Sequence, residues 1–223
     1  MSGGATDRLI VALARDARPV TPVPSLRWEV AAVAAVTLAI SLALVEERGL
    51  RPPGLELLRA PTPFALVALG LALAGLGAVT ASLAFARPGR ERTAWRAVTA
   101  TALGLFLSVG TASLVLLGSP PGAEAVWGGW LEVPCVLMSL TLSVPAALIV
   151  TYLAASAAPL RPTATAFLAA CGATALGTFA GHLICRTPGA WHVVTTHGAI
   201  PLVGGFWVAG PVLRLLQSWT RSA

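Results

Sequence analysis

The sequence of 223 residues is 56% hydrophobic and 11% charged, with a formal net charge of +6 and a mean hydropathy of +0.80. A soluble domain needs about 25% charged residues to cover its surface, so this composition excludes a soluble globular protein, and its apolar content excludes a disordered chain. Three cysteines and no repeats exclude a disulfide scaffold and a collagen-like chain. The composition predicts an all-α integral membrane protein.

The N-terminal segment, residues 1–27, is the longest piece expected outside the membrane, and we expect a short amphipathic helix in it. Thr6 or Asp7 can cap this helix, and the prolines from Pro19 onward end it. Its apolar stripe consists of Leu9, Ile10 and Leu13. A helix this short is not stable alone. It therefore needs a partner, which could be the lipid surface, the membrane domain or the groove of another protein.

Six uncharged runs follow, and a helix crosses the hydrocarbon of a bilayer in about 20 residues. The runs cover residues 30–45, 60–86, 97–123, 133–160, 162–185 and 187–213. The first run is short and is expected to extend at its start through Trp28 and Glu29. Six of the seven tryptophans lie near run ends, where an interfacial aromatic belt belongs. We predict a six-helix transmembrane bundle with short loops over residues 28–214, followed by a tail at 215–223.

The arginines predict the orientation of these helices. With the N-terminus inside, eleven of the fifteen arginines lie in cytoplasmic segments and four in outer loops. Cytoplasmic segments carry an excess of positive charge, so both termini are expected in the cytoplasm. The first loop, with three arginines and three glutamates, counts against this orientation. The first run follows four arginines and three prolines, which favours an anchor over a cleavable signal peptide.

No Asp, Glu, Lys or Arg lies in the middle of a span. Coupled transporters usually place such groups there, so a small-molecule transporter is the less favoured interpretation. Small residues on one face of the fifth span permit close helix packing, and we expect packing within the chain rather than dimerisation. These residues are Ala169, Ala173, Gly177 and Gly181.

The thiols and imidazoles are the remaining candidates for chemistry. Cys135 begins the fourth span and Cys185 ends the fifth, with His182 three residues before Cys185 on a neighbouring helical position. His192 and His197 open the sixth span from the same side. These five groups are therefore predicted to meet at one outer rim.

Such a rim could hold a disulfide, a Cys/His metal site or side chains that only pack. Cys171 lies 14 residues before Cys185, about 21 Å along a helix, and is expected outside this group. The absence of a CxxC pair argues against a thioredoxin-type redox centre. A membrane redox or haem protein that uses His182, His197 and the outer cysteines remains the alternative from another class.

Several of these features resemble one family. They are an Asp-x-Leu-Ile-x-x-Leu-Ala-x-Asp opening followed by Pro-Val, a cysteine before the fourth span with its proline Pro145, and the His-x-x-Cys that ends the fifth span. The pattern resembles the NrsF family of bacterial inner-membrane anti-sigma factors over nearly the whole chain. The light-response anti-sigma factors of carotenoid-producing bacteria are similar in size and plan.

The resemblance implies a regulator without enzymatic activity, cofactor or direct contact with nucleic acid. Its cytoplasmic N-terminus would hold an extracytoplasmic-function sigma factor until metal, oxidant or light through singlet oxygen releases it. The partner-binding residues would be Asp7, Leu9, Ile10, Leu13, Ala14, Asp16, Pro19 and Val20. Signal sensing would fall on Cys135, Cys185 and His182, whereas the resemblance implies no role for His192 and His197.

Overall fold

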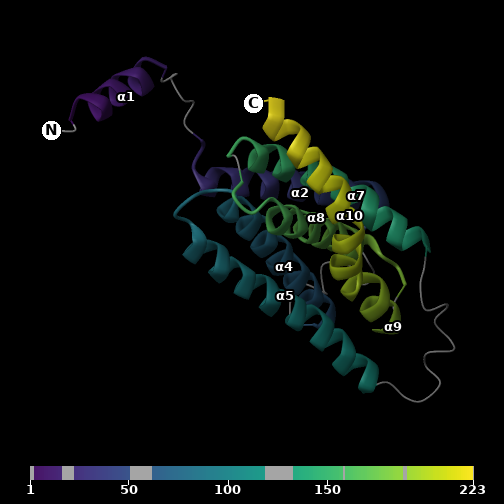
Figure 1. The fold of residues 1–223 in the computed structure, drawn as a ribbon. Coiled ribbons are helices and arrows are strands. Elements are labelled where there is room, and N and C mark those ends of the chain that lie inside the picture. The colour runs from purple at the N-terminus through teal and green to yellow at the C-terminus, as the bar shows by residue number, and fades with distance from the viewer. Residues whose placement is uncertain are drawn as a thin grey trace.

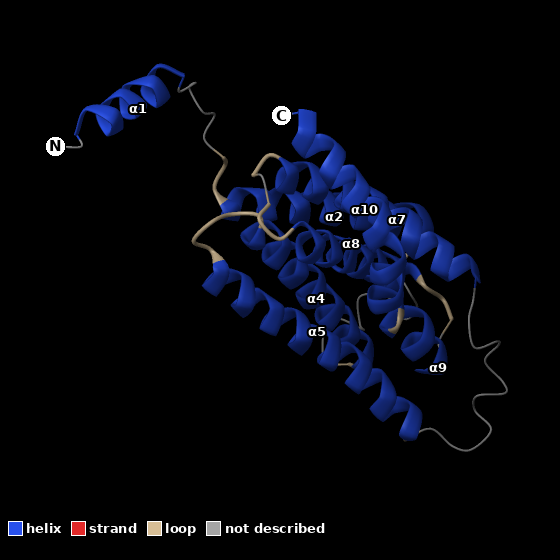
Figure 2. Cartoon of the chain, in the orientation of Figure 1, coloured by secondary structure: helices blue, strands red, loops and turns tan. Residues whose placement is uncertain are grey.

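The computed structural model describes residues 3–16, 23–50, 62–118, 133–157, 159–187 and 190–222 (Figure 1). Every regular element in these ranges is helical (Figure 2), which confirms the all-α prediction. The helices are α1 (Gly3–Asp16), α2 (Leu26–Arg48), α4 (Pro63–Phe85), α5 (Glu91–Leu117), α7 (Val133–Ala155), α8 (Pro162–Ile184), α9 (Ala190–His192), the π-helical turn η1 (Val193–Gly198) and α10 (Ile200–Ser222).

Six helices are long and apolar enough to cross a membrane, as predicted; the sixth is formed by η1 and α10 together. The first span is longer than its uncharged run and begins at Leu26, so that Glu29 lies in its first turn. The third begins at Glu91, six residues earlier than its uncharged run. Charged residues at a helix end can stay in the interface, so an uncharged run underestimates the length of the helix that contains it.

Large apolar side chains on the outer helices are exposed, including Phe106 and Leu117 on α5 and Trp207 on α10. In water such a surface would be a liability, but lipid tails solvate it. Together with the six spans, this surface identifies a multi-pass membrane protein.

The central helix of the bundle is α8, which contacts α2, α4, α7 and α10. Its Ala, Gly and Thr side chains let these neighbours approach closely. A Cβ atom placed on Gly177 would lie 2.6 Å from the backbone nitrogen of Ser143 on α7. The small residues of this face are buried within the chain, which confirms the prediction of internal packing.

A buried ion pair joins two elements at the end of the bundle where α2 begins. Glu29 pairs with Arg87, which follows α4, and the Glu29 side chain is only 3% exposed. Arg87 also donates hydrogen bonds to the carbonyl oxygens of Pro24, at 3.3 Å, and Leu83, at 3.4 Å. The chain that enters the first span is therefore held against the connection between α4 and α5.

The N-terminal helix α1 stands apart from the bundle in Figure 1. It begins at Gly3, so the prediction that Thr6 or Asp7 caps it is wrong. Gly3, Gly4 and Ala5 are already helical, so both predicted cap residues lie inside the helix and not at its start. The described helix runs to Asp16, and the prolines that were predicted to end it at Pro19 and Pro22 lie outside the described residues.

Candidate functional site

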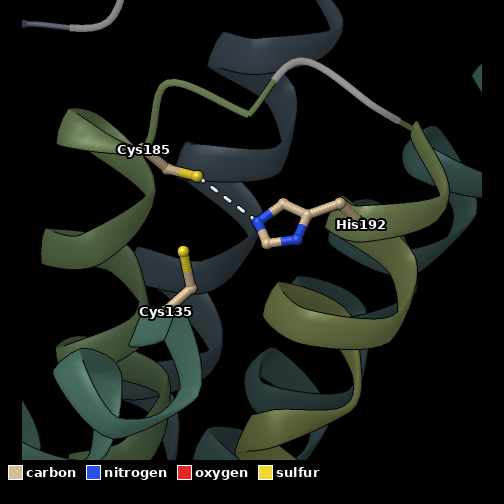
Figure 3. Close-up of side chains that lie close together, drawn as sticks. All are labelled: Cys135, Cys185 and His192. Atoms are coloured by element: carbon tan, nitrogen blue, oxygen red, sulfur yellow. Dashed lines mark hydrogen bonds between the residues drawn. The ribbon is translucent and has the colours of Figure 1, made fainter. Parts of the chain in front are cut away.

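Three donor atoms meet at the end of the bundle opposite the Glu29–Arg87 pair. The Sγ atoms of Cys135 and Cys185 and a ring nitrogen of His192 all lie within 4.8 Å of one another (Figure 3). Cys185 and His192 are buried and Cys135 is partly buried. The three cysteines of the chain are free thiols. We call Cys135, Cys185 and His192 the thiol–imidazole group.

Three different elements supply this group. Cys135 lies in the first turn of α7, and His192 ends the short helix α9. Cys185 directly follows α8 and has extended backbone angles, with φ −67° and ψ 120°. The extended residue turns the chain out of α8, and the next helix brings His192 back toward the thiol.

Hydrogen bonds orient the imidazole of His192. Its Nε2 lies 3.3 Å from Cys185 Sγ, and its Nδ1 lies 3.2 Å from Thr196 Oγ1. A neutral ring that carries its proton on Nδ1 satisfies both contacts: the thiol donates to Nε2, and Nδ1–H donates to the hydroxyl oxygen. In this tautomer the Nε2 lone pair faces the two sulfur atoms.

An open cavity of about 560 Å³ borders the two thiols. Its lining also includes Glu47, Arg48 and Arg186. The Arg186 guanidinium donates a hydrogen bond to the Arg48 carbonyl oxygen at 2.9 Å, which joins the segment after α8 to the end of α2. The cavity provides access for a small solute to both thiols.

His182 is not part of the thiol–imidazole group, although sequence placed it beside Cys185. Its Nε2 lies 3.3 Å from the Phe64 carbonyl oxygen, and its ring stacks on that of Phe64 with centroids 4.5 Å apart. His197 lies between the other two imidazoles, 5.1 Å from the His182 centroid and 5.0 Å from that of His192. All three rings are at most 2% exposed. A continuous row of imidazoles thus runs from the thiols to α4.

These ring contacts bear on the haem alternative. A porphyrin held by His182 and His197 would have to lie between two rings that already touch, while Phe64 stacks against His182. The geometry does not favour this pair as axial ligands.

His192 is the site residue that sequence reasoning left without a role. The available signal was the Pro188-Gly189 pair between Cys185 and His192, since this dipeptide is typical of a turn. A turn there would bring the start of the next helix back toward the end of α8.

The turn η1 positions both His197 and Thr196. Ala199 N donates to the Val194 carbonyl oxygen at 3.1 Å, a bond that spans five residues. Pro201 follows and has no N–H, so the regular helical bonding pattern is interrupted here. Single π-helical turns are often found at functional sites.

Cys171 is buried in α8 and is not part of the thiol–imidazole group, as its distance along the helix predicted. Among the predicted partner-binding residues, Ile10 is 58% and Leu13 is 63% exposed on α1. Asp7, Ala14 and Asp16 also lie on α1. Pro19, Val20 and the side chain of Leu9 are outside the described part of the structure.

The fold and this site define a class, namely a multi-pass membrane bundle with a buried thiol–imidazole group at one end and a separate amphipathic helix at its N-terminus. The family described as negative regulator of sigma F, NrsF, matches residues 13–215. The chain belongs to this family, which confirms the resemblance seen in the sequence and makes it a negative regulator of a sigma factor. Asp7, Leu9 and Ile10 precede the matched region. No curated protein and no solved structure matches the chain.

Proposed function

We propose that this protein is an anti-sigma factor of the bacterial inner membrane that holds an extracytoplasmic-function sigma factor at its cytoplasmic N-terminus. The observation that carries this proposal is the exposed apolar stripe of α1. Ile10 and Leu13 lie three residues apart on a helix outside the bundle, and both are more than half exposed. Such a stripe fits the hydrophobic groove of a partner protein.

Burial of the apolar stripe would favour formation of the complex. Burial of a few hundred Å² of apolar surface, at about 25 cal/mol per Å², contributes several kcal/mol before the cost of association is deducted. The segment around Asp16, Pro19 and Val20 would add further contacts.

The distribution of arginines supports cytoplasmic termini. The connection between α4 and α5 and the end of α10 carry Arg87, Arg90 and Arg221, at the end of the bundle that also holds the start of α2. The sequence of the segments that join the helices at the opposite end contains four arginines, against eleven in the segments expected inside. This asymmetry follows the rule that positive charge is retained inside.

We further propose that the signal acts on Cys135 and Cys185, with His182 coupled to them through the row of imidazoles. A metal ion or an oxidant would bind or link the thiols and change the packing of α7, α8 and η1. Release then requires that the two packings differ in their affinity for the sigma factor. If light through singlet oxygen is the signal, the thiols would be incidental.

The test is co-purification from the native host, with the full chain compared with a chain lacking residues 1–24. We expect a sigma factor of the extracytoplasmic-function class only with the full chain. A matched pair of substitutions locates the contact: Leu13→Asp should abolish recovery of the sigma factor, whereas Val11→Asp should retain it. Val11 is 51% exposed but lies on the opposite face of α1. Equal recovery with both variants would refute binding through the stripe.

A further inference from the structure

We propose that Cys135, Cys185 and His192 bind a thiophilic divalent cation of the zinc–cadmium class. The regulatory function of this site rests on the sensing role proposed above. Binding of the ion itself can be tested separately.

The donor atoms need little movement to enclose an ion. They lie within 4.8 Å of one another, and the Cys185 Sγ to His192 Nε2 distance is 3.3 Å. A zinc ion with bonds of about 2.3 Å to sulfur and about 2.0 Å to nitrogen separates its ligands by roughly 3.5–3.8 Å. Rotation of the Cys135 side chain, which is only partly buried, can close the remaining gap of about 1 Å.

The donor set selects the class of ion. Two thiols and an imidazole are soft and borderline ligands, which favour zinc-like ions over magnesium or calcium. Each thiol loses its proton to solvent when it binds, so a divalent ion with two thiolates and a neutral imidazole forms an uncharged unit. An uncharged unit is the least costly one to bury beside hydrocarbon. A disulfide between Cys135 and Cys185 would give the imidazole no role.

Thr196 completes the site as a positioning residue. Its hydroxyl contacts Nδ1 of His192 and leaves Nε2 directed at the sulfur atoms. An imidazole that binds a metal through one nitrogen is usually fixed by a hydrogen bond at the other. Here that bond comes from η1, one turn after His192.

The open cavity explains how an ion enters and leaves. The chain supplies three ligands, and the cavity beside the thiols leaves a fourth position for water or for an exchangeable ligand. Structural zinc sites are usually closed by four protein ligands, whereas open sites exchange ligands. Three ligands and an open side suit a site that is filled only when the ion is abundant.

The experiment is a titration of the purified, reduced full chain with Cd²⁺ in detergent. Binding is measured by the absorption of the sulfur-to-cadmium charge-transfer band. We expect one ion per chain in the unsubstituted protein. Cys135→Ser and Cys185→Ser should abolish the absorption, and His192→Ala should weaken binding by about 100-fold or more. Thr196→Val should weaken binding by about 10- to 100-fold, while Thr196→Ser should restore it. Cys171→Ser is the matched control and should bind as the unsubstituted chain does.

Two results would overturn the proposal: no binding by the reduced chain, or unchanged affinity in His192→Ala. Size-exclusion profiles establish whether each variant remains folded. If His192→Ala does not fold, the comparison of Thr196→Val with Thr196→Ser still tests the site. Release of the co-purified sigma factor is measured separately. Binding with the expected pattern but without release would leave the metal site intact and refute the sensing role. If an oxidant releases the sigma factor but cadmium binds with the same affinity in His192→Ala, the sensing role is supported and the proposed metal site is refuted.

Discussion

Removal of Arg87 should destabilise the bundle strongly, because it leaves Glu29 buried without its partner. The Glu29 side chain is 3% exposed, and within the described residues its Oε1 accepts no hydrogen bond. In Arg87→Met both carboxylate oxygens would be unsatisfied. Loss of one member of a buried pair costs about 3–5 kcal/mol. We expect the lower end of this range because the Arg87 side chain is 12% exposed.

The double variant Glu29→Leu/Arg87→Met separates the pair from its surroundings. Replacement of both charges by apolar side chains is often neutral or stabilising, so the double variant should recover most of the stability lost in Arg87→Met. What remains lost would reflect the hydrogen bonds from Arg87 to Pro24 and Leu83, at about 1 kcal/mol each.

The assay is reversible unfolding in mixed detergent, with the free energy of unfolding measured for both single variants and the double variant. Arg90→Met, an exposed arginine in the same connection, is the matched control and should change stability by less than about 0.5 kcal/mol. A stabilising role of the buried pair is excluded if Arg87→Met unfolds like Arg90→Met, or if the losses in the two single variants simply add in the double variant.

Three further predictions concern packing, sensing and orientation. Gly177→Ala should destabilise the bundle by several kcal/mol, because its Cβ would meet the α7 backbone. Gly110 has open space around it, so Gly110→Ala should be neutral or stabilising by up to about 1 kcal/mol. Equal unfolding curves for the two variants would contradict this. The double variant Cys135→Ser/Cys185→Ser should retain the sigma factor but no longer release it when cells are exposed to cadmium, chromate or oxidant. Cys171→Ser should respond normally. A full response in the double variant would exclude thiol sensing. A green fluorescent protein fused to the C-terminus should fluoresce and alkaline phosphatase at the same place should be inactive, and the reverse pattern would invert the proposed orientation.

The six spans and the small-residue face of α8 could be predicted from sequence because both depend on local properties. Hydrocarbon requires about 20 apolar residues for each crossing, and a repeat of four residues places Gly177 and Gly181 on one helix face. The separation of Cys171 from the outer thiol also followed from the rise of a single helix. No knowledge of neighbouring helices was needed for these features.

The residues that form the site could not be predicted in the same way. Helical spacing placed His182 next to Cys185, but Cys185 lies beyond the end of α8 in extended conformation and its sulfur contacts His192 instead. Glu29 likewise finds its partner 58 residues away in Arg87. The sequence by itself determined which helices form and which end of the bundle carries the thiols and imidazoles. Only the tertiary structure decided which donor atoms meet, because that depends on how α7, α8 and α9 are placed at their ends and on the path of the chain between them.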